Sequence, residues 1–125
     1  MNFDKSIDPN NMFESIYNFS SQMKEAKSIG EGIILKNSYK GVQNIVLCGM
    51  GGSAIGGDLS RSLVKSSLNM PIFVNRNYSL PNWVNSNSLV IASSYSGNTE
   101  ESLAAYHEAI SKGATVIGIT TGGKL

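Results

Sequence analysis

The sequence contains a single cysteine, Cys48, so no disulfide can form within the chain. Cys48 belongs to the apolar run 45–48, which indicates a buried small side chain rather than a catalytic thiol. The net charge is only +1 at pH 7, and no block of like charge occurs, which argues against a nucleic-acid surface or a membrane-binding tail. The sequence also shows no cluster of metal ligands, and we expect no metal and no cofactor.

Two kinds of targeting segment are also missing from the sequence. No basic stretch followed by an apolar run opens the chain, and no apolar stretch reaches the ~18 residues that a membrane span needs. We therefore expect a reduced, cytoplasmic setting.

The N-terminal part of the chain has helical spacing. Apolar residues recur at steps of mostly three and four between residues 10 and 27, which predicts one helix with an apolar face. The members of that face are Met12, Phe13, Ile16, Phe19 and Met23. We expect Gly30 and Gly32 to interrupt the helix and residues 33–35 to begin a second short one. We interpret residues 1–43 as an N-terminal helical segment that packs on the rest of the chain and carries no site.

From residue 44 onward, predicted strands and helices alternate. Apolar runs predict strands at 44–48, 71–74, 88–92 and 115–119. Helices are predicted at 53–64 and 99–112, the second stopped by Gly113. This alternation predicts an α/β fold, a doubly wound parallel sheet with helices on both faces. The sequence stops in a turn where another helix is expected, which suggests that residues 44–125 are a domain truncated at its C-terminus.

Two polar turns follow predicted strands: residues 49–54, the first turn, and residues 94–99, the second turn. In open parallel sheets, ligands bind beyond the carboxyl ends of the strands. Each turn also precedes a helix, whose unpaired N–H groups and dipole favour an anion. Both turns are therefore candidate parts of an anion site.

The second turn offers three hydroxyls, from Ser94, Ser96 and Thr99, around Gly97. Hydroxyl and amide donors suit the acceptor oxygens of a phosphate. The same residue types also cap helices, with Glu100 and Glu101 favoured in the first helical turn. The residues alone leave both interpretations open.

The first turn matches the dinucleotide fingerprint in its G-x-G-x-x-A form, which by itself is a weak signal. The fingerprint also needs an acid after the second strand, and this chain has Asn75, Arg76 and Asn77 there. Because Arg76 is able to accept a 2′-phosphate, a dinucleotide remains an alternative. One phosphorylated ligand held by both turns would account for the two motifs together.

The combination of residues 51–53 with residues 94–99 resembles the sugar isomerase (SIS) domain family. The longer strings 47–58, 93–101 and 119–125 are similar to the bifunctional phosphoglucose/phosphomannose isomerases within it. The resemblance implies a flavodoxin-like, three-layer SIS domain from residue 44 to the end. It implies that Gly52 and Ser53 touch the substrate, and that Ser94, Ser96 and Thr99 bind its phosphate.

The resemblance also implies an activity and a partner. Such enzymes interconvert glucose 6-phosphate, or mannose 6-phosphate, with fructose 6-phosphate through an enediol, and they are typically homodimers. Their glutamate base, histidine, lysine and arginine are expected beyond Leu125. We therefore expect no catalytic residue in this chain, and no activity of the chain alone.

Other readings remain for the chain and its residues. His107, Arg76 and Lys124 are interpreted as surface side chains, and Tyr95 as a pocket wall or a packing residue of the turn. A sugar-phosphate-sensing regulatory module is an alternative, although residues 1–40 lack the basic helix-turn-helix that such proteins carry. Another sugar-phosphate isomerase, such as a phosphoheptose isomerase, is a further alternative.

Overall fold

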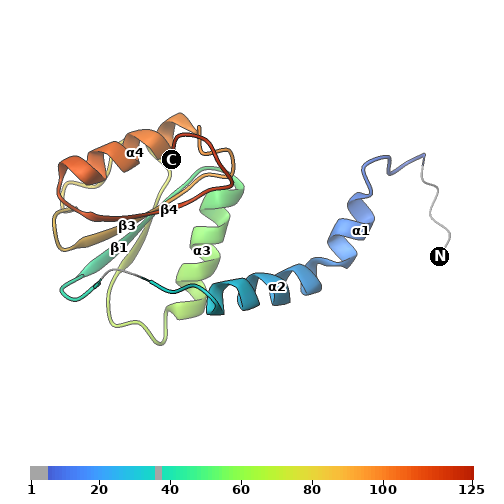
Figure 1. Cartoon of the computed structure of the whole chain (residues 1–125), viewed down its shortest axis with the longest axis horizontal. Helices are drawn as coiled ribbons and strands as arrows, with labels where there is room; N and C mark the ends of the chain where they lie inside the picture. The colour runs from blue at the N-terminus through green and yellow to red at the C-terminus, as the bar shows by residue number, and fades with distance from the viewer. Residues whose placement is uncertain (1–5, 36–37) are drawn as a thin grey trace. The chain divides into compact units, whose positions relative to one another are not determined.

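The computed structural model describes residues 6–35 and 38–125 and divides into two compact units, Met1–Ser38 and Tyr39–Leu125 (Figure 1). The first unit contains the helices α1 (Met12–Tyr17) and α2 (Phe19–Glu31). The carboxylate of Asp8 accepts hydrogen bonds from the backbone N–H groups of Met12 and Phe13, at 2.7 and 2.9 Å, and so satisfies the start of α1.

The structure corrects two predictions in this unit. The single helix predicted from 10 to 27 is broken at Asn18, a residue type whose side chain competes for backbone hydrogen bonds and disfavours helix interiors. The second helix predicted at 33–35 does not form: α2 continues through Gly30 to Glu31, with Gly32 as its C-cap residue, and residues 33–35 are not helical. One glycine costs a helix only about 1 kcal/mol, too little for Gly30 to end it.

The second unit is built on a parallel sheet with strand order β2-β1-β3-β4. The strands are β1 (Asn44–Cys48), β2 (Ile72–Asn75), β3 (Ser88–Ser93) and β4 (Thr115–Ile119). The helices α3 (Gly52–Val64) and α4 (Glu100–Ser111) complete the unit. Each strand and helix predicted between 44 and 119 is confirmed to within one residue at either end, as is the α/β fold class.

The two helices cover opposite faces of this sheet. Val46 pairs with Val90, and Val90 with Val116, so these side chains share one face, where Val46 and Val90 form a buried cluster with Ala105 and Ala109 of α4. On the other face, a Cβ at Gly57 of α3 would lie 3.3 Å from the Leu47 side chain and 3.4 Å from that of Val74. The absence of a side chain at Gly57 therefore lets α3 lie close to β1 and β2.

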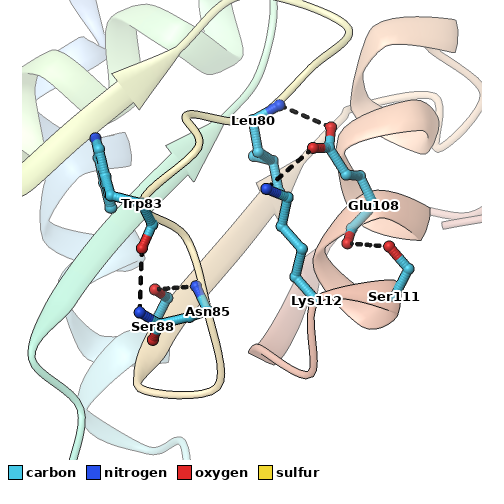
Figure 2. A network of polar contacts seen from close by, with 7 residues as sticks. All are labelled: Leu80, Trp83, Asn85, Ser88, Glu108, Ser111 and Lys112. Carbon is cyan, nitrogen blue, oxygen red and sulfur yellow. Dashed lines mark hydrogen bonds and ion pairs between the residues drawn. The ribbon is translucent and has the colours of Figure 1, made fainter.

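The connection from β2 to β3 is fastened to α4 by polar contacts (Figure 2). The Glu108 carboxylate accepts a hydrogen bond from the Leu80 backbone N–H at 2.8 Å and forms an ion pair with Lys112 at 3.5 Å. At the end of the connection, the Ser88 hydroxyl accepts a hydrogen bond from the Asn85 N–H at 3.0 Å. Buried Leu80 and Val84 are thereby held against the core on the α4 side.

Across residues 6–35 and 38–125, no helix has both the length and the apolar character needed to cross a membrane.

Candidate functional site

The two polar turns follow two strands that are neighbours in the sheet. After β1 the chain passes through α3 to β2 on one side, and it then returns to form β3 on the other side of β1. The strand order therefore reverses between β1 and β3, which is the point where open α/β sheets bind ligands. The first turn follows β1 and the second turn follows β3, so the topology places both at this point.

The second turn is held by hydrogen bonds among its own residues. The hydroxyls of Ser94 and Thr99 are 2.9 Å apart, and the Ser94 hydroxyl also accepts a hydrogen bond from the Gly97 N–H at 3.1 Å. Ser94 is only 2% exposed, so its hydroxyl faces the interior of the turn. Ser96 is exposed, and its hydroxyl accepts a hydrogen bond from the Asn98 N–H at 3.2 Å. The turn thus presents Ser96 outward and uses Ser94 internally.

Neither helix that begins at this edge is capped by a side chain. Thr99 is the N-cap residue of α4 and Gly51 that of α3, and neither position makes a side-chain capping hydrogen bond. The interpretation of the second turn as a side-chain cap is therefore wrong, because the Thr99 hydroxyl bonds to Ser94 instead. The first N–H groups of both helices have no intrahelical acceptor. Apart from the Ser53 N–H, which donates to the Met50 carbonyl at 3.1 Å, they remain available to an anion.

The first turn requires glycine at its tightest points. Gly51 has φ +52° and ψ −123°, a backbone conformation that residues with side chains rarely adopt. A Cβ at Gly49 would lie 3.1 Å from the Ser93 carbonyl oxygen, which shows how closely this turn approaches the end of β3. Gly52 and Ser53, predicted to touch the substrate, are the first two residues of α3; Gly52 is exposed and Ser53 half-buried.

A cavity of about 240 Å³ lies beneath the first turn, on the α3 side of the sheet. Ser53 and Ser93 contribute polar atoms to its wall, and Leu47, Ile91 and Ile119 contribute apolar surface. A larger cavity, of about 480 Å³, lies at the opposite edge, where α3 ends and β2 begins, and includes Arg61 and Lys65. We place the candidate site at the turns, because the larger cavity contains none of the residues around them.

A third segment, residues 120–125, lies against the second turn, and we call it the closing loop. The Tyr95 carbonyl accepts hydrogen bonds from the Thr121 hydroxyl at 2.6 Å and from the Thr121 N–H at 3.3 Å. The Gly97 carbonyl accepts hydrogen bonds from the N–H groups of Lys124 and Leu125, both at 3.1 Å. Sequence reasoning treated these residues only as part of a family resemblance; the Gly122-Gly123 pair was the available signal of a close backbone approach.

Most ionisable residues near the turns already have partners. Arg76, the candidate for a dinucleotide 2′-phosphate, forms an ion pair with Asp58 of α3, which also lies 3.6 Å from Arg61. His107 is exposed on α4, as predicted, with its ring edge-on to Tyr106. The guanidinium of Arg76 is therefore paired with a carboxylate, and a phosphate would have to compete for it.

Two groups have shifted pKa values. Burial raises the pKa of Cys48 to about 11; a hydrogen bond from Asn75 lowers it and the Glu108 charge raises it further. Its thiol is therefore protonated at neutral pH, and its 3% exposure confirms the prediction of a buried small side chain. The pKa of Tyr78 is raised, mainly by the negative charge of Glu101 and to a smaller extent by desolvation and by the charge of Glu100.

Within the described part of the chain, no three His, Cys, Asp or Glu side chains come together in a way that would hold a metal ion.

Comparison with known proteins finds a family and several relatives. The family model described as SIS domain matches residues 39–124. The bifunctional phosphoglucose/phosphomannose isomerase of Caldicellulosiruptor bescii is 53% identical over 114 residues, which are 91% of this chain and 34% of that protein. The protein of the same name from Thermoplasma acidophilum is 42% identical over 82% of this chain and 33% of its own length. The chain thus spans about a third of the length of these relatives.

Solved structures share the fold of the second unit. A candidate phosphosugar isomerase from Salmonella typhimurium LT2 superposes with a TM-score of 0.59 and 27% identity, over 63% of this chain and 25% of that one. A candidate phosphosugar isomerase from Bacillus subtilis gives a TM-score of 0.57 and 28% identity, over 65% and 26% of the two chains.

Proposed function

The chain belongs to the SIS domain family, and on that premise we propose that it binds the phosphate of a sugar phosphate at its second turn. The amides at the start of α4 and the exposed hydroxyl of Ser96 are the donors that this chain offers to the phosphate. The second turn carries no basic residue, so binding rests on hydrogen bonds and on the α4 dipole.

We further propose that the phosphate belongs to a hexose 6-phosphate and that the whole protein is an aldose–ketose isomerase. The relatives named above are bifunctional phosphoglucose/phosphomannose isomerases. By this proposal glucose 6-phosphate and mannose 6-phosphate are interconverted with fructose 6-phosphate. The chain then anchors the substrate, with Gly52 and Ser53 near the sugar, while groups outside residues 1–125 move the proton. A homodimer in the cytoplasm is part of this proposal.

One observation carries the assignment of the phosphate site. Two helices begin without a side-chain cap at the two turns that flank the reversal of strand order. A serine-rich turn would be expected to cap its helix, and here its hydroxyls bond to one another or to the turn backbone instead. The helix N–H groups that remain are suited to an anion that bridges the turns.

Titration calorimetry with this chain tests the binding step. We expect saturable binding of glucose 6-phosphate and of inorganic phosphate, and no binding of glucose, because the phosphate supplies the acceptors. Ser96→Ala is expected to weaken the binding of both phosphate ligands. Ser67→Ala is the matched control, because Ser67 is an exposed serine just beyond the far end of α3. Equal affinity for glucose and glucose 6-phosphate, or binding of neither phosphate ligand, would contradict the proposal.

A chimera tests the reaction. This chain would replace the matching 114-residue segment of the Caldicellulosiruptor bescii relative. We expect the folded chimera to convert fructose 6-phosphate into glucose 6-phosphate and mannose 6-phosphate, and Ser96→Ala to raise its KM. A folded chimera that binds phosphate but converts neither sugar would reject the isomerase and favour the sugar-phosphate-sensing alternative.

A further inference from the structure

The hydrogen bonds inside the second turn do not involve all of its backbone groups. These internal bonds join the hydroxyls of Ser94, Ser96 and Thr99, the N–H groups of Gly97 and Asn98, and the carbonyls of Ser94 and Ser96. Two of its carbonyls, those of Tyr95 and Gly97, point out of the turn and receive their hydrogen bonds from the closing loop. In Figure 1 the closing loop is the red end of the chain, beside the orange turn that enters α4.

The two segments touch backbone to backbone. A Cβ at Gly97 would overlap the Gly122 carbonyl oxygen, and one at Gly123 would overlap the Ser96 carbonyl oxygen. The contact continues from the sheet, where the Ser94 N–H donates to the Ile119 carbonyl at 3.0 Å. The end of β4 and the closing loop therefore support the second turn from Ser94 to Gly97.

This support fixes the direction of one amide. The peptide bond between Tyr95 and Ser96 is trans and planar, so its N–H points away from its C=O. Thr121 holds the Tyr95 carbonyl with both its hydroxyl and its N–H, and the Ser96 N–H is therefore directed away from the closing loop. That N–H meets no acceptor among the residues that the structure describes.

We propose that Thr121 is a positioning residue for anion binding: its hydroxyl orients the Tyr95–Ser96 peptide so that the Ser96 N–H donates to the phosphate. This inference rests on the proposed function of the second turn and adds to it a residue outside that turn. Thr121 is exposed and its side chain lies 2.6 Å from a single acceptor, so its effect on binding is separable from the stability of the core.

The test compares Thr121→Val with Thr121→Ser in the full chain, with Thr115→Val as control. Thr115 is half-buried at the start of β4, the strand that leads to the closing loop, and so lies at the end of that strand away from the loop. With inorganic phosphate and glucose 6-phosphate as probes, we expect Thr121→Val to lower the affinity for each about five- to tenfold. Thr121→Ser and Thr115→Val should bind both probes with the affinity of the unaltered chain. The two Thr121 variants should also unfold at the same thermal midpoint as the unaltered chain.

An amide readout separates positioning from general loosening. Phosphate should shift the Ser96 amide resonance in the unaltered chain and in Thr121→Ser, and shift it much less in Thr121→Val. Unchanged affinity in Thr121→Val would overturn the inference and leave the proposed function standing. An equal loss in Thr121→Ser would overturn it too, because the hydroxyl is retained there. Absence of phosphate binding by the unaltered chain would remove both the proposed function and this inference.

Discussion

The replacement Gly97→Ala tests the contact between the second turn and the closing loop most directly. Gly97 is buried with φ +65°, and a methyl group there would enter the space of the Gly122 carbonyl and of the Thr120 hydroxyl. The neighbouring atoms are mainly backbone, so they cannot move aside as the end of a flexible side chain would.

The expected loss of stability has two parts. A left-handed φ costs an alanine about 1–2 kcal/mol, and forcing a methyl group into packed backbone costs about a further 1–3 kcal/mol. Gly97→Ala should therefore lower the free energy of unfolding by about 2–5 kcal/mol, a large part of the ~5–15 kcal/mol that stabilises a typical domain.

Gly113→Ala is the matched control for the first part. Gly113 has φ +71°, but a Cβ there would find its nearest neighbour, the Ser86 Cβ, at an ordinary 3.8 Å. We expect a loss of about 1–2 kcal/mol from the backbone term alone. Gly122→Ala has no such φ and open space around its Cβ, so its effect should be close to zero.

Urea unfolding followed by the fluorescence of Trp83 provides the measurement. Trp83 is the single tryptophan, and its ring lies edge-on to that of Phe73, with the ring centroids 6.0 Å apart. Its fluorescence therefore reports on the Tyr39–Leu125 unit. Equal losses in Gly97→Ala and Gly113→Ala would refute the reasoning, because the contact with the closing loop would then contribute nothing.

Three further predictions concern single side chains. Ser94→Ala should lower the free energy of unfolding, measured in urea, by about 1–3 kcal/mol, because the Thr99 hydroxyl and the Gly97 N–H lose a buried hydrogen-bond partner. Ser96→Ala, at an exposed position, should not lower it. A larger loss in Ser96→Ala than in Ser94→Ala would contradict the internal role of Ser94. The pKa of Cys48 in the folded protein, about 11, exceeds its reference value of 9.0, so the thiol ionises at lower pH in the unfolded chain. The free energy of unfolding should therefore fall between about pH 9 and 11, by about 2–3 kcal/mol in total. Cys48→Ala should lack that part of the slope in unfolding measured at pH 8 and 10.5, and an unchanged slope would reject the assignment. Glu108→Ala should lower the free energy of unfolding by about 1–2 kcal/mol, because it removes the acceptor for the Leu80 N–H. Glu108→Gln should lower it less, because the amide oxygen still accepts that hydrogen bond. Equal losses would show that the charge that pairs with Lys112, rather than the hydrogen bond to Leu80, matters.

Local patterns in the sequence were sufficient for the elements of the second unit. The run from Ile45 to Cys48 and the run from Leu89 to Ala92 are continuous apolar segments, which buried parallel strands require. The glycine and serine turns after them indicated where the sheet presents its carboxyl edge. The same approach failed at Asn18, a residue type that disfavours helix interiors, and at residues 33–35, which are apolar but form no helix.

The candidate site was predictable only in part. The turn that contains Ser94, Ser96 and Thr99 was identified as a group, and whether these residues, Gly52 and Ser53 contact a ligand stays a prediction. The inward direction of the Ser94 hydroxyl was not predictable, because it depends on how Gly97 turns the backbone.

The amino-acid sequence alone was enough to specify strands, helices and the two glycine-containing turns, because each depends on residues that are close neighbours along the chain. The tertiary structure decided what those turns can do. Strand pairing placed β1 beside β3, and the path of the chain after β4 brought Thr121 to the carbonyl of Tyr95. These contacts join residues far apart in the sequence, and hydrophobic periodicity contains no information about which distant backbone groups will meet.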